Sequence, residues 1–475
     1  MATSHVTGPS SSRRWAGLGI LTLAVLLLAI DGTVLALAIP ALTADLEPSS
    51  TQILWIGDIY AFALAGLLVV MGNLADRLGR KRLLMIGSIG FGLSSLAAAF
   101  APTPELLIVA RTVLGISGAT IMPSTLAIVR DLFPDARERT RAVAVWAAGA
   151  TAGAAIGPVV GGMLLQHFHW GSVFLINVPI MLIVVIGGTA LLPESRDPGK
   201  GRIDVLSAVL SFVAIVPIVY AVKHLVAEGF DVTVVGGIVV GVAAGWWFIV
   251  RQRRVTTPLI DVALFRRPAF SGAVVADTVT IFGFVGLLFF FSQYLQLVRG
   301  LSPLGAGLVE LSASVASVIV IALAGAAVAW LGRGRAIGAG LALAAIGLVV
   351  LAVAEGAAHL VWIVVAFAVI GFGTGLSMAL NTDAIVSAAP PNRAGAASSV
   401  AETAYELGAA LGIAVLGSLQ NVFYRAHLPA IGDAGTRAVI EDSLAAASSH
   451  LDPSAPGMAE LLERAREAFI VGMQW

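Results

Sequence analysis

Three carboxylates in apolar surroundings are the residues of this chain best placed to do chemistry: Asp31, Glu402 and Glu406. Asp31 lies in the otherwise uncharged run of residues 15–39. A helix of about 25 residues rises about 1.5 Å per residue and is long enough to cross a bilayer. A carboxylate in the hydrocarbon costs roughly 2.5–3.5 kcal/mol even on the mildest scale, and such residues are usually functional. The position of Asp31 therefore predicts a functional acid.

Glu402 and Glu406 are four residues apart, which places both carboxylates on one face of a helix, next to Tyr405. Two acids so close disfavour each other's ionisation, and burial acts in the same direction. The pair therefore suits the uptake of protons near neutral pH. The same face can attract a cation, to which Tyr405 offers an aromatic ring.

The composition limits the class of protein that can carry these acids. The chain has 475 residues, of which 58% are hydrophobic and 12% are charged, and its mean hydropathy is +0.95. Soluble domains carry about 25% charged residues, so we expect an all-α polytopic membrane protein. The zero net charge gives no case for nucleic-acid binding, and the lack of cysteine excludes disulfides and thiolate metal sites. We expect no metal site and no cofactor. The chain carries no nucleotide-binding P-loop and no enzyme motif.

Thirteen apolar segments are long enough to be membrane spans. They cover residues 15–39, 52–74, 83–101, 105–129, 142–166, 171–192, 203–222, 232–250, 269–297, 303–331, 336–355, 359–381 and 395–421. With the N-terminus in the cytoplasm, the inner loops hold most of the Lys and Arg residues, and the short outer loops hold only Lys223 and Arg299. This asymmetry follows the positive-inside rule and predicts the orientation.

A weak internal repeat divides the chain into two parallel halves. The segment from Gly72 to Arg80 has a counterpart from Gly325 to Arg333, and the pair Gly153 and Gly157 has a counterpart in Gly408 and Gly412. The two offsets are nearly equal. Parallel repeats related by an axis along the membrane normal are one plan of secondary transporters.

Two glycine-rich motifs are candidates for gating. In the first loop, Asp76 can form a charge cluster with Arg77 and Arg80, while glycine permits the tight turn. In the fifth span, glycines remove side-chain bulk at a helix contact and a proline bends the helix. The gating candidates are Gly72, Asp76, Arg77, Gly79, Arg80, Gly153, Gly157, Pro158, Gly161 and Gly162.

These motifs resemble those of the major facilitator superfamily, and within it the fourteen-helix drug:proton antiporters. The resemblance covers residues 15–421 and extends to Asp31-Gly-Thr33 in span 1, Arg111-x3-Gly115 in span 4, Asn177-Val-Pro179 in span 6 and Glu402 to Gly408 in span 13. It implies a major facilitator fold of two six-helix halves with two extra helices between them. It also implies proton coupling by Asp31, Arg111, Glu402 and Glu406, with Arg111 facing span 1.

Further residues are candidates for contact with a substrate. Asp58 and Trp55 lie early in span 2, and Asp58 is alternatively an acid at the helix entry among lipid headgroups. Asp277 and Trp146 join Glu402 and Tyr405 in this set, although core packing or lipid contact is an alternative for Trp146. Glu310, in span 10, is either a contact for the substrate or an acid at a helix entry.

The resemblance implies an organisation and a function. We expect a cytoplasmic N-terminus (1–14), an N-terminal bundle (15–192), a linker with two extra helices (193–268), a C-terminal bundle of five helices (269–421), and an outer loop with a truncated last helix (422–475). We expect a monomer in the cytoplasmic membrane of a bacterium that exports amphipathic cations such as quaternary ammonium compounds in exchange for protons.

Two departures from the family keep alternatives open. Ala36 stands five residues after Asp31, where the family usually has an asparagine. The segment from Phe469 to Trp475 is too short to cross a bilayer, so we expect the last helix to be missing. The alternatives are an exporter of a physiological lipid or metabolite, and a membrane protein that does not transport.

Overall fold

The computed structural model describes residues 11–474, except 197–203, 256–257, 259, 261, 357–358, 390–393, 430–432, 452–453 and 456. The basic residues Lys200, Arg202 and Arg393, assigned to inner loops, lie outside the described residues. The described chain is helical and holds no strand. Twelve helices in it are long and apolar enough to cross a membrane, and Val209–Leu225 is a shorter apolar helix. The predicted polytopic helical architecture is confirmed.

The first half of the bundle is formed by seven helices. They are α1 (Ser11–Leu46), α2 (Ser50–Leu78), α3 (Arg80–Ala99), α4 (Pro104–Leu132), α5 (Ala136–His167), α6 (Ser172–Leu175) and α7 (Asn177–Leu191). Polar caps fix where several of them begin. Ser49 and Gln52 form a reciprocal capping box at the start of α2, and the Asp135 carboxylate accepts two backbone N–H bonds at the start of α5.

The second half contains α10 (Pro268–Gln293), the π-helical turn η2 (Tyr294–Val298), α11 (Pro303–Leu331), α12 (Arg333–Ala354), α13 (Val361–Ala388) and α14 (Ala394–His427). A short 3-10 turn, η1 (Val262–Arg266), precedes it. In the first half α1 packs on α5 and α4 packs on both α2 and α3; in the second half α10 packs on α14 and α13 packs on both α11 and α12. The second half thus repeats the packing of the first.

The repeat reaches individual residues. A Cβ added at Gly153 or Gly157 would overlap α1, and one added at Gly408 or Gly412 would overlap α10. The turns before α3 and α12 each use a glycine with positive φ, Gly79 at 110° and Gly332 at 76°, a conformation that other residues rarely adopt. Close approach of helix backbones through small residues is how membrane helices pack without a hydrophobic driving force between them.

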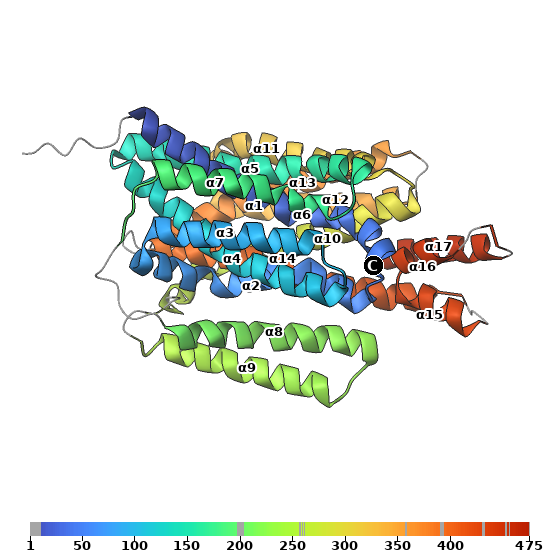
Figure 1. Ribbon diagram of the computed structural model, residues 1–475. Helices are drawn as coiled ribbons and strands as arrows, with labels where there is room; N and C mark the ends of the chain where they lie inside the picture. Colours follow the sequence, from blue (N-terminus) through green and yellow to red (C-terminus); the bar gives the residue numbers. More distant parts are fainter. Residues whose placement is uncertain are drawn as a thin grey trace, which may run out of the picture.

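Two further groups of helices flank the halves (Figure 1). The helices α8 (Val205–Glu228) and α9 (Val232–Gln252) form a separate layer, in which α8 contacts α2 and α14. At one end of the bundle lie α15 (Ala434–Asp442), α16 (Leu444–His450) and α17 (Met458–Gln474). We call this the α15–α17 end, and we call the opposite end, which carries the turn between α2 and α3, the arginine-rich end.

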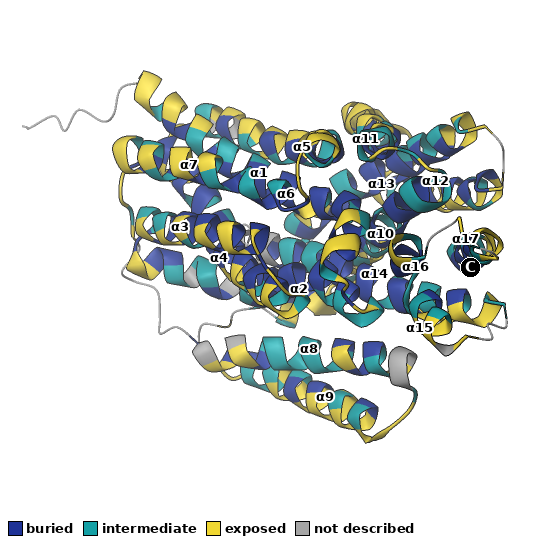
Figure 2. Ribbon diagram, turned by 45° about the vertical axis from the view of Figure 1, so that its right-hand side comes forward, coloured by how far each residue is buried: buried dark blue, intermediate teal, exposed yellow. Residues whose placement is uncertain are grey.

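The outer surface of the helices is apolar, as a lipid-facing surface must be. Exposed residues line the outside of the bundle and the α9 face of the extra pair (Figure 2). They include large side chains such as Leu93, Ile186, Trp246 and Val349, which are 64%, 61%, 68% and 67% exposed. A soluble protein rarely exposes so many large apolar residues together.

Candidate functional site

The predicted functional acid Asp31 is buried in the middle of the first half and has two polar partners. Its Oδ2 lies 3.6 Å from Nη1 of Arg111 on α4, and both side chains are at most 2% exposed. The amide of Asn177, the first residue of α7, donates to Asp31 Oδ1 over 2.7 Å and to Ser95 Oγ over 3.0 Å. The sequence placed Arg111 opposite span 1, and the structure brings the two residues together. The contact with Asn177 was missed, although this residue belongs to a motif that the sequence singled out.

Arg111 connects this ion pair to α2. Its Nε donates to the carbonyl oxygen of Ile56 over 3.0 Å and its Nη2 to that of Gly57 over 3.4 Å. Its guanidinium carbon lies 5.0 Å from the centre of the Tyr60 ring. A buried arginine needs such hydrogen bonds because its charge would otherwise remain uncompensated. The Asp31–Arg111 pair therefore reports directly on the position of α2.

The second group of acids lies in the other half. Glu402 and Glu406 of α14 are half-buried and within electrostatic range of each other, and Asp277 of α10 is within range of Glu402. Tyr405 is within range of all three carboxylates. Within the described part of the chain, no lysine or arginine forms an ion pair with these acids. This group can hold protons or a cation from elsewhere.

The four residues predicted to couple protons form two groups, Asp31 with Arg111 in the first half and Glu402 with Glu406 in the second. Tyr60 of α2 lies between them, within electrostatic range of Asp31 on one side and of Glu406 on the other. The sequence did not indicate this role for Tyr60, because a single tyrosine in an apolar span has no distinguishing spacing.

The predicted substrate contacts on α2 are already occupied. Asp58 is fully buried, and its Oδ2 lies 2.6 Å from Nζ of Lys223 on α8. Trp55 lies beneath the same ammonium group, 3.8 Å from Nζ to the ring centre. The assignment of Lys223 to an outer loop was wrong, because the residue is buried within α8. The alternative of Asp58 as an acid among headgroups is likewise wrong. Trp146 donates from Nε1 to Thr125 Oγ1 over 3.2 Å and is half-buried.

The loop between α2 and α3 forms a charge cluster, but its residues differ from the predicted set of Asp76, Arg77 and Arg80. Arg80 pairs with Asp76 over 2.8 Å and with Asp131 at the end of α4, whereas the Arg77 side chain is exposed. The corresponding residue of the second half, Arg333, pairs with Asp383 over 2.7 Å. Among the described ion pairs at the arginine-rich end, none joins one half of the bundle to the other.

The two halves contact each other toward the α15–α17 end. Gln296 donates to the Leu37 carbonyl oxygen over 3.1 Å. A Cβ added at Gly307 of α11 would overlap the carbonyl oxygen of Pro158, and one added at Gly162 would overlap the backbone of Leu304. The predicted gating residues Pro158 and Gly162 thus lie where the halves meet, while Gly153, Gly157 and Gly161 pack on α1.

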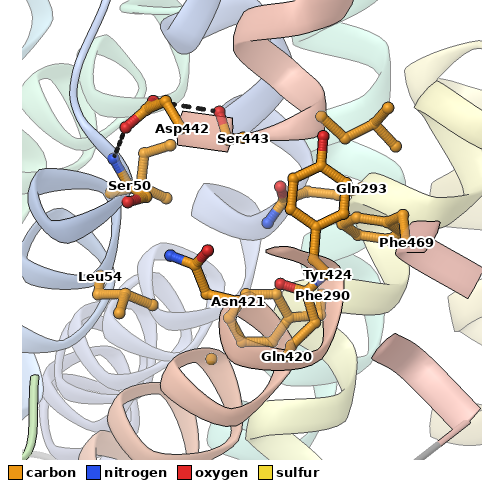
Figure 3. Close-up of a pocket in the computed structure, with 13 residues that line it drawn as sticks. Ser50, Leu54, Phe290, Gln293, Gln420, Asn421, Tyr424, Asp442, Ser443 and Phe469 are labelled. Atoms are coloured by element: carbon orange, nitrogen blue, oxygen red, sulfur yellow. Dashed lines mark hydrogen bonds between the residues drawn. The ribbon is translucent and has the colours of Figure 1, made fainter. Parts of the chain in front are cut away.

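A small pocket lies at the same end of the bundle, lined by residues of α2, α10, α14 and the α15–α17 segment. Figure 3 shows Asn421 between Leu54 and Tyr424, with Phe290 and Gln293 from α10 alongside. Asp442 forms part of the wall and accepts a hydrogen bond from the Ser50 backbone N–H over 3.0 Å. The aromatic and amide side chains of the wall come from α10, α14 and α17, whereas α2 contributes Ser50, Ile53 and Leu54.

The apolar helices, the repeated halves and the buried charges define a multi-pass membrane protein with transporter architecture. Residues 21–413 match the Major Facilitator Superfamily, and the chain belongs to this superfamily. The multidrug efflux pump LfrA of Mycolicibacterium smegmatis is 45% identical over 470 residues, which cover 98% of this chain and 93% of the relative. The methyl viologen resistance protein SmvA of Salmonella typhimurium is 39% identical over 465 residues, covering 96% and 93%.

A solved structure supports the fold independently. A bacterial homologue of the human lysosomal transporter Spinster, in an inward-facing and unoccupied conformation, superimposes with a TM-score of 0.68. The two chains are 16% identical, and the match covers 98% of this chain and 95% of the other. At that identity the similarity shows the fold alone.

Proposed function

We propose that this transporter exports amphipathic organic cations from the cell in exchange for protons, by alternating access. The observation that carries the proposal is the acidic group of Glu402, Glu406 and Asp277, which has no basic partner among the described residues. Tyr60 lies within electrostatic range of both Glu406 and Asp31. An acidic group in apolar surroundings stabilises either bound protons or a bound cation, and the two compete for the same negative charge.

The relatives support the proposal that the transported substrate is an organic cation. LfrA is a multidrug efflux pump and SmvA confers resistance to methyl viologen, which is an organic dication. Tyr405 and Tyr60 offer aromatic faces next to the carboxylates, and cation–π contact strengthens when water is excluded. The site is thus suited to a delocalised or quaternary cation more than to a strongly hydrated metal ion.

The loop charges support a cytoplasmic N-terminus in the plasma membrane of a bacterium. The arginine-rich end then faces the cytoplasm, and the α15–α17 end faces outward. Because the contacts between the halves lie toward the α15–α17 end, this conformation is the inward-facing one. A cytoplasmic cation would then approach Glu402 and Glu406 from the arginine-rich end.

The exchange follows from charge balance. A cation neutralises the acidic group, and rocking of the halves about Pro158 and Gly307 exposes it to the outside. Protons from outside then replace the cation, because a protonated carboxyl no longer attracts it. Asp31 and Arg111 contribute a second titratable pair that is attached to α2 through the carbonyl oxygens of Ile56 and Gly57. Protonation of Asp31 would weaken its pairing with Arg111 and so change the position of α2.

Ethidium efflux from cells expressing the variants tests the proposal. Asp31→Asn and Glu402→Gln should abolish pH-dependent efflux, whereas Glu463→Gln, on the exposed face of α17, should retain it. Expression must be matched by quantifying the protein in membranes. Unchanged efflux in both Asp31→Asn and Glu402→Gln would refute the mechanism.

A further inference from the structure

A second buried ion pair lies outside the acidic group, between α2 and the extra helix α8. Lys223 and Asp58 are 2.6 Å apart, and their side chains are 1% and 0% exposed. Burying two charges is costly unless each compensates the other closely, and removing one partner leaves the other charge buried without compensation. The pair is therefore a strong local constraint on how α8 sits.

The surroundings of the Lys223 ammonium have the chemistry of a site for an organic amine. The carboxylate of Asp58 supplies the counter-charge, and the face of Trp55 lies 3.8 Å from Nζ. Tyr220 extends the aromatic wall, with its ring centre 6.3 Å from that of Trp55. A carboxylate combined with an aromatic face is a recurrent way to recognise ammonium groups. We call Asp58 and Trp55 the α2 cage.

Occupation of the α2 cage is linked to the docking of α8. Val219 of α8 packs with Phe62 of α2 and with Ala410 and Ala414 of α14, so α8 crosses the line where the two halves meet. A second polar contact, from Ser211 Oγ to the Gly66 carbonyl oxygen over 3.3 Å, lies further along α8. Withdrawal of Lys223 from the cage would therefore loosen α8 from both halves.

The cage also adjoins the central ion pair. Arg111 donates to the carbonyl oxygens of Ile56 and Gly57, the two residues that precede Asp58. A movement of Asp58 is thus felt at Arg111 and, through it, at Asp31. The presence or absence of the Lys223 ammonium group in the α2 cage is therefore coupled to the central ion pair.

We propose that Asp58 and Trp55 form a binding site for a primary alkylammonium group, which Lys223 fills as a tethered occupant in this conformation. A free alkylamine of the same shape binds when the Lys223 side chain is removed. Displacement of Lys223 from the cage weakens the packing of α8 on α2 and α14. The consequence for transport rests on the proposed function, whereas binding in the cage does not.

Chemical rescue of purified full-length protein tests the site. Lys223→Ala removes three carbons and the amine, which together correspond to n-propylammonium. We expect this variant to melt at a lower temperature than the wild type, and n-propylammonium chloride to recover at least half of the lost Tm in a saturable manner. Sodium chloride and 1-propanol at equal concentration should have no such effect, and the wild type should show no response to the amine.

The double variant Lys223→Ala/Asp58→Asn is the matched control, because it lacks the counter-charge and should show no rescue. Equal rescue by 1-propanol, rescue in the double variant, or no rescue of a folded Lys223→Ala would overturn the proposal. If Lys223→Ala does not fold, Lys223→Met keeps the side-chain length. Lys223→Met/Asp58→Asn should then melt at a higher temperature than Lys223→Met, and the opposite order overturns the proposal.

The two proposals fail separately in this design. Amine rescue without any export of cations by the wild type would reject the proposed function and retain the α2 cage. Export of cations by the wild type without amine rescue of Lys223→Ala would retain the proposed function and reject the α2 cage.

Discussion

Arg111 lies 3.6 Å from Asp31 with both side chains buried, and the same guanidinium group donates to two carbonyl oxygens of α2. A single side chain thus joins the functional acid of α1 to the backbone of the helix that faces the second half. This relationship gives the central ion pair a mechanical consequence, because any change in the charge of Asp31 alters what holds α2.

Replacing Arg111 should destabilise the protein strongly. Arg111→Leu leaves the Asp31 carboxylate buried without its counter-charge, which typically costs about 3–5 kcal/mol. Thermal unfolding in detergent measures the loss. The double variant Arg111→Leu/Asp31→Asn removes both charges and should recover much of it. A single variant as stable as the wild type would show that Asp31 does not depend on Arg111.

Asn177 should act as a positioning residue for Asp31. Asn177→Leu removes a hydrogen bond of 2.7 Å to the carboxylate, a type of bond typically worth about 1.5–3 kcal/mol when one partner is charged. The expected result is a shift in the pH dependence of ethidium efflux together with a lower Tm. Ser95→Ala is the milder comparison, since it removes only the 3.0 Å bond to the Asn177 amide. A lower Tm with an unchanged pH profile would assign Asn177 a purely structural role.

Closure at the α15–α17 end should require a glycine at position 307. A side chain there would overlap the Pro158 carbonyl oxygen, so Gly307→Val should hold the halves apart and reduce efflux more than tenfold. Gly272→Val is the matched control, because a Cβ at Gly272 meets no atom within 4 Å. Comparable efflux from Gly307→Val and the wild type would place the contact between the halves elsewhere.

Acidic pH should strengthen one contact of the α15–α17 end. His450 Nε2 lies 3.0 Å from Glu47 Oε1. The Ala446 carbonyl oxygen, together with Glu47, raises the pKa of His450 above its ordinary value of 6.5. A raised pKa in the folded state gives a stabilisation that is fully present below the ordinary pKa and is lost as the pH rises through the raised value.

The matching measurement is the Tm of wild type and His450→Gln as a function of pH. The variant should melt below the wild type at pH 5.5, and the two curves should converge toward pH 8.5. His427→Gln, at the end of α14, controls for a general effect of losing a histidine. A Tm difference that is constant across this range would contradict the assignment to His450 and Glu47.

The spans could be predicted from the sequence because a membrane span must be apolar over its whole length, and the repeat because its two offsets agree. The contact between Asp31 and Arg111 was implied by the resemblance to the drug:proton antiporters, and the mutual relief of two buried charges makes it physically reasonable. Lys223 escaped prediction because it lies close to the end of an apolar run, where a lysine usually reaches water. Its burial depends on how α8 packs against α2, which no local pattern encodes.

The helices α15, α16 and α17 could not be predicted from the sequence either. These helices are short and carry polar faces, so they lack the continuous apolar run that marks a span. The partner of Arg80 was missed for a similar reason, since Asp131 lies 51 residues later in the sequence, at the end of α4, and follows no spacing rule. Long-range packing decides such contacts.

The most direct test of the account is the release of protons when a cation binds. Purified wild-type protein in weakly buffered detergent solution is mixed with tetraphenylphosphonium, and the pH is followed with an indicator dye. We expect a saturable release of protons that is reduced in Glu402→Gln and in Glu406→Gln. Binding of the cation by the wild type with no release of protons at any pH between 6 and 8 would contradict it.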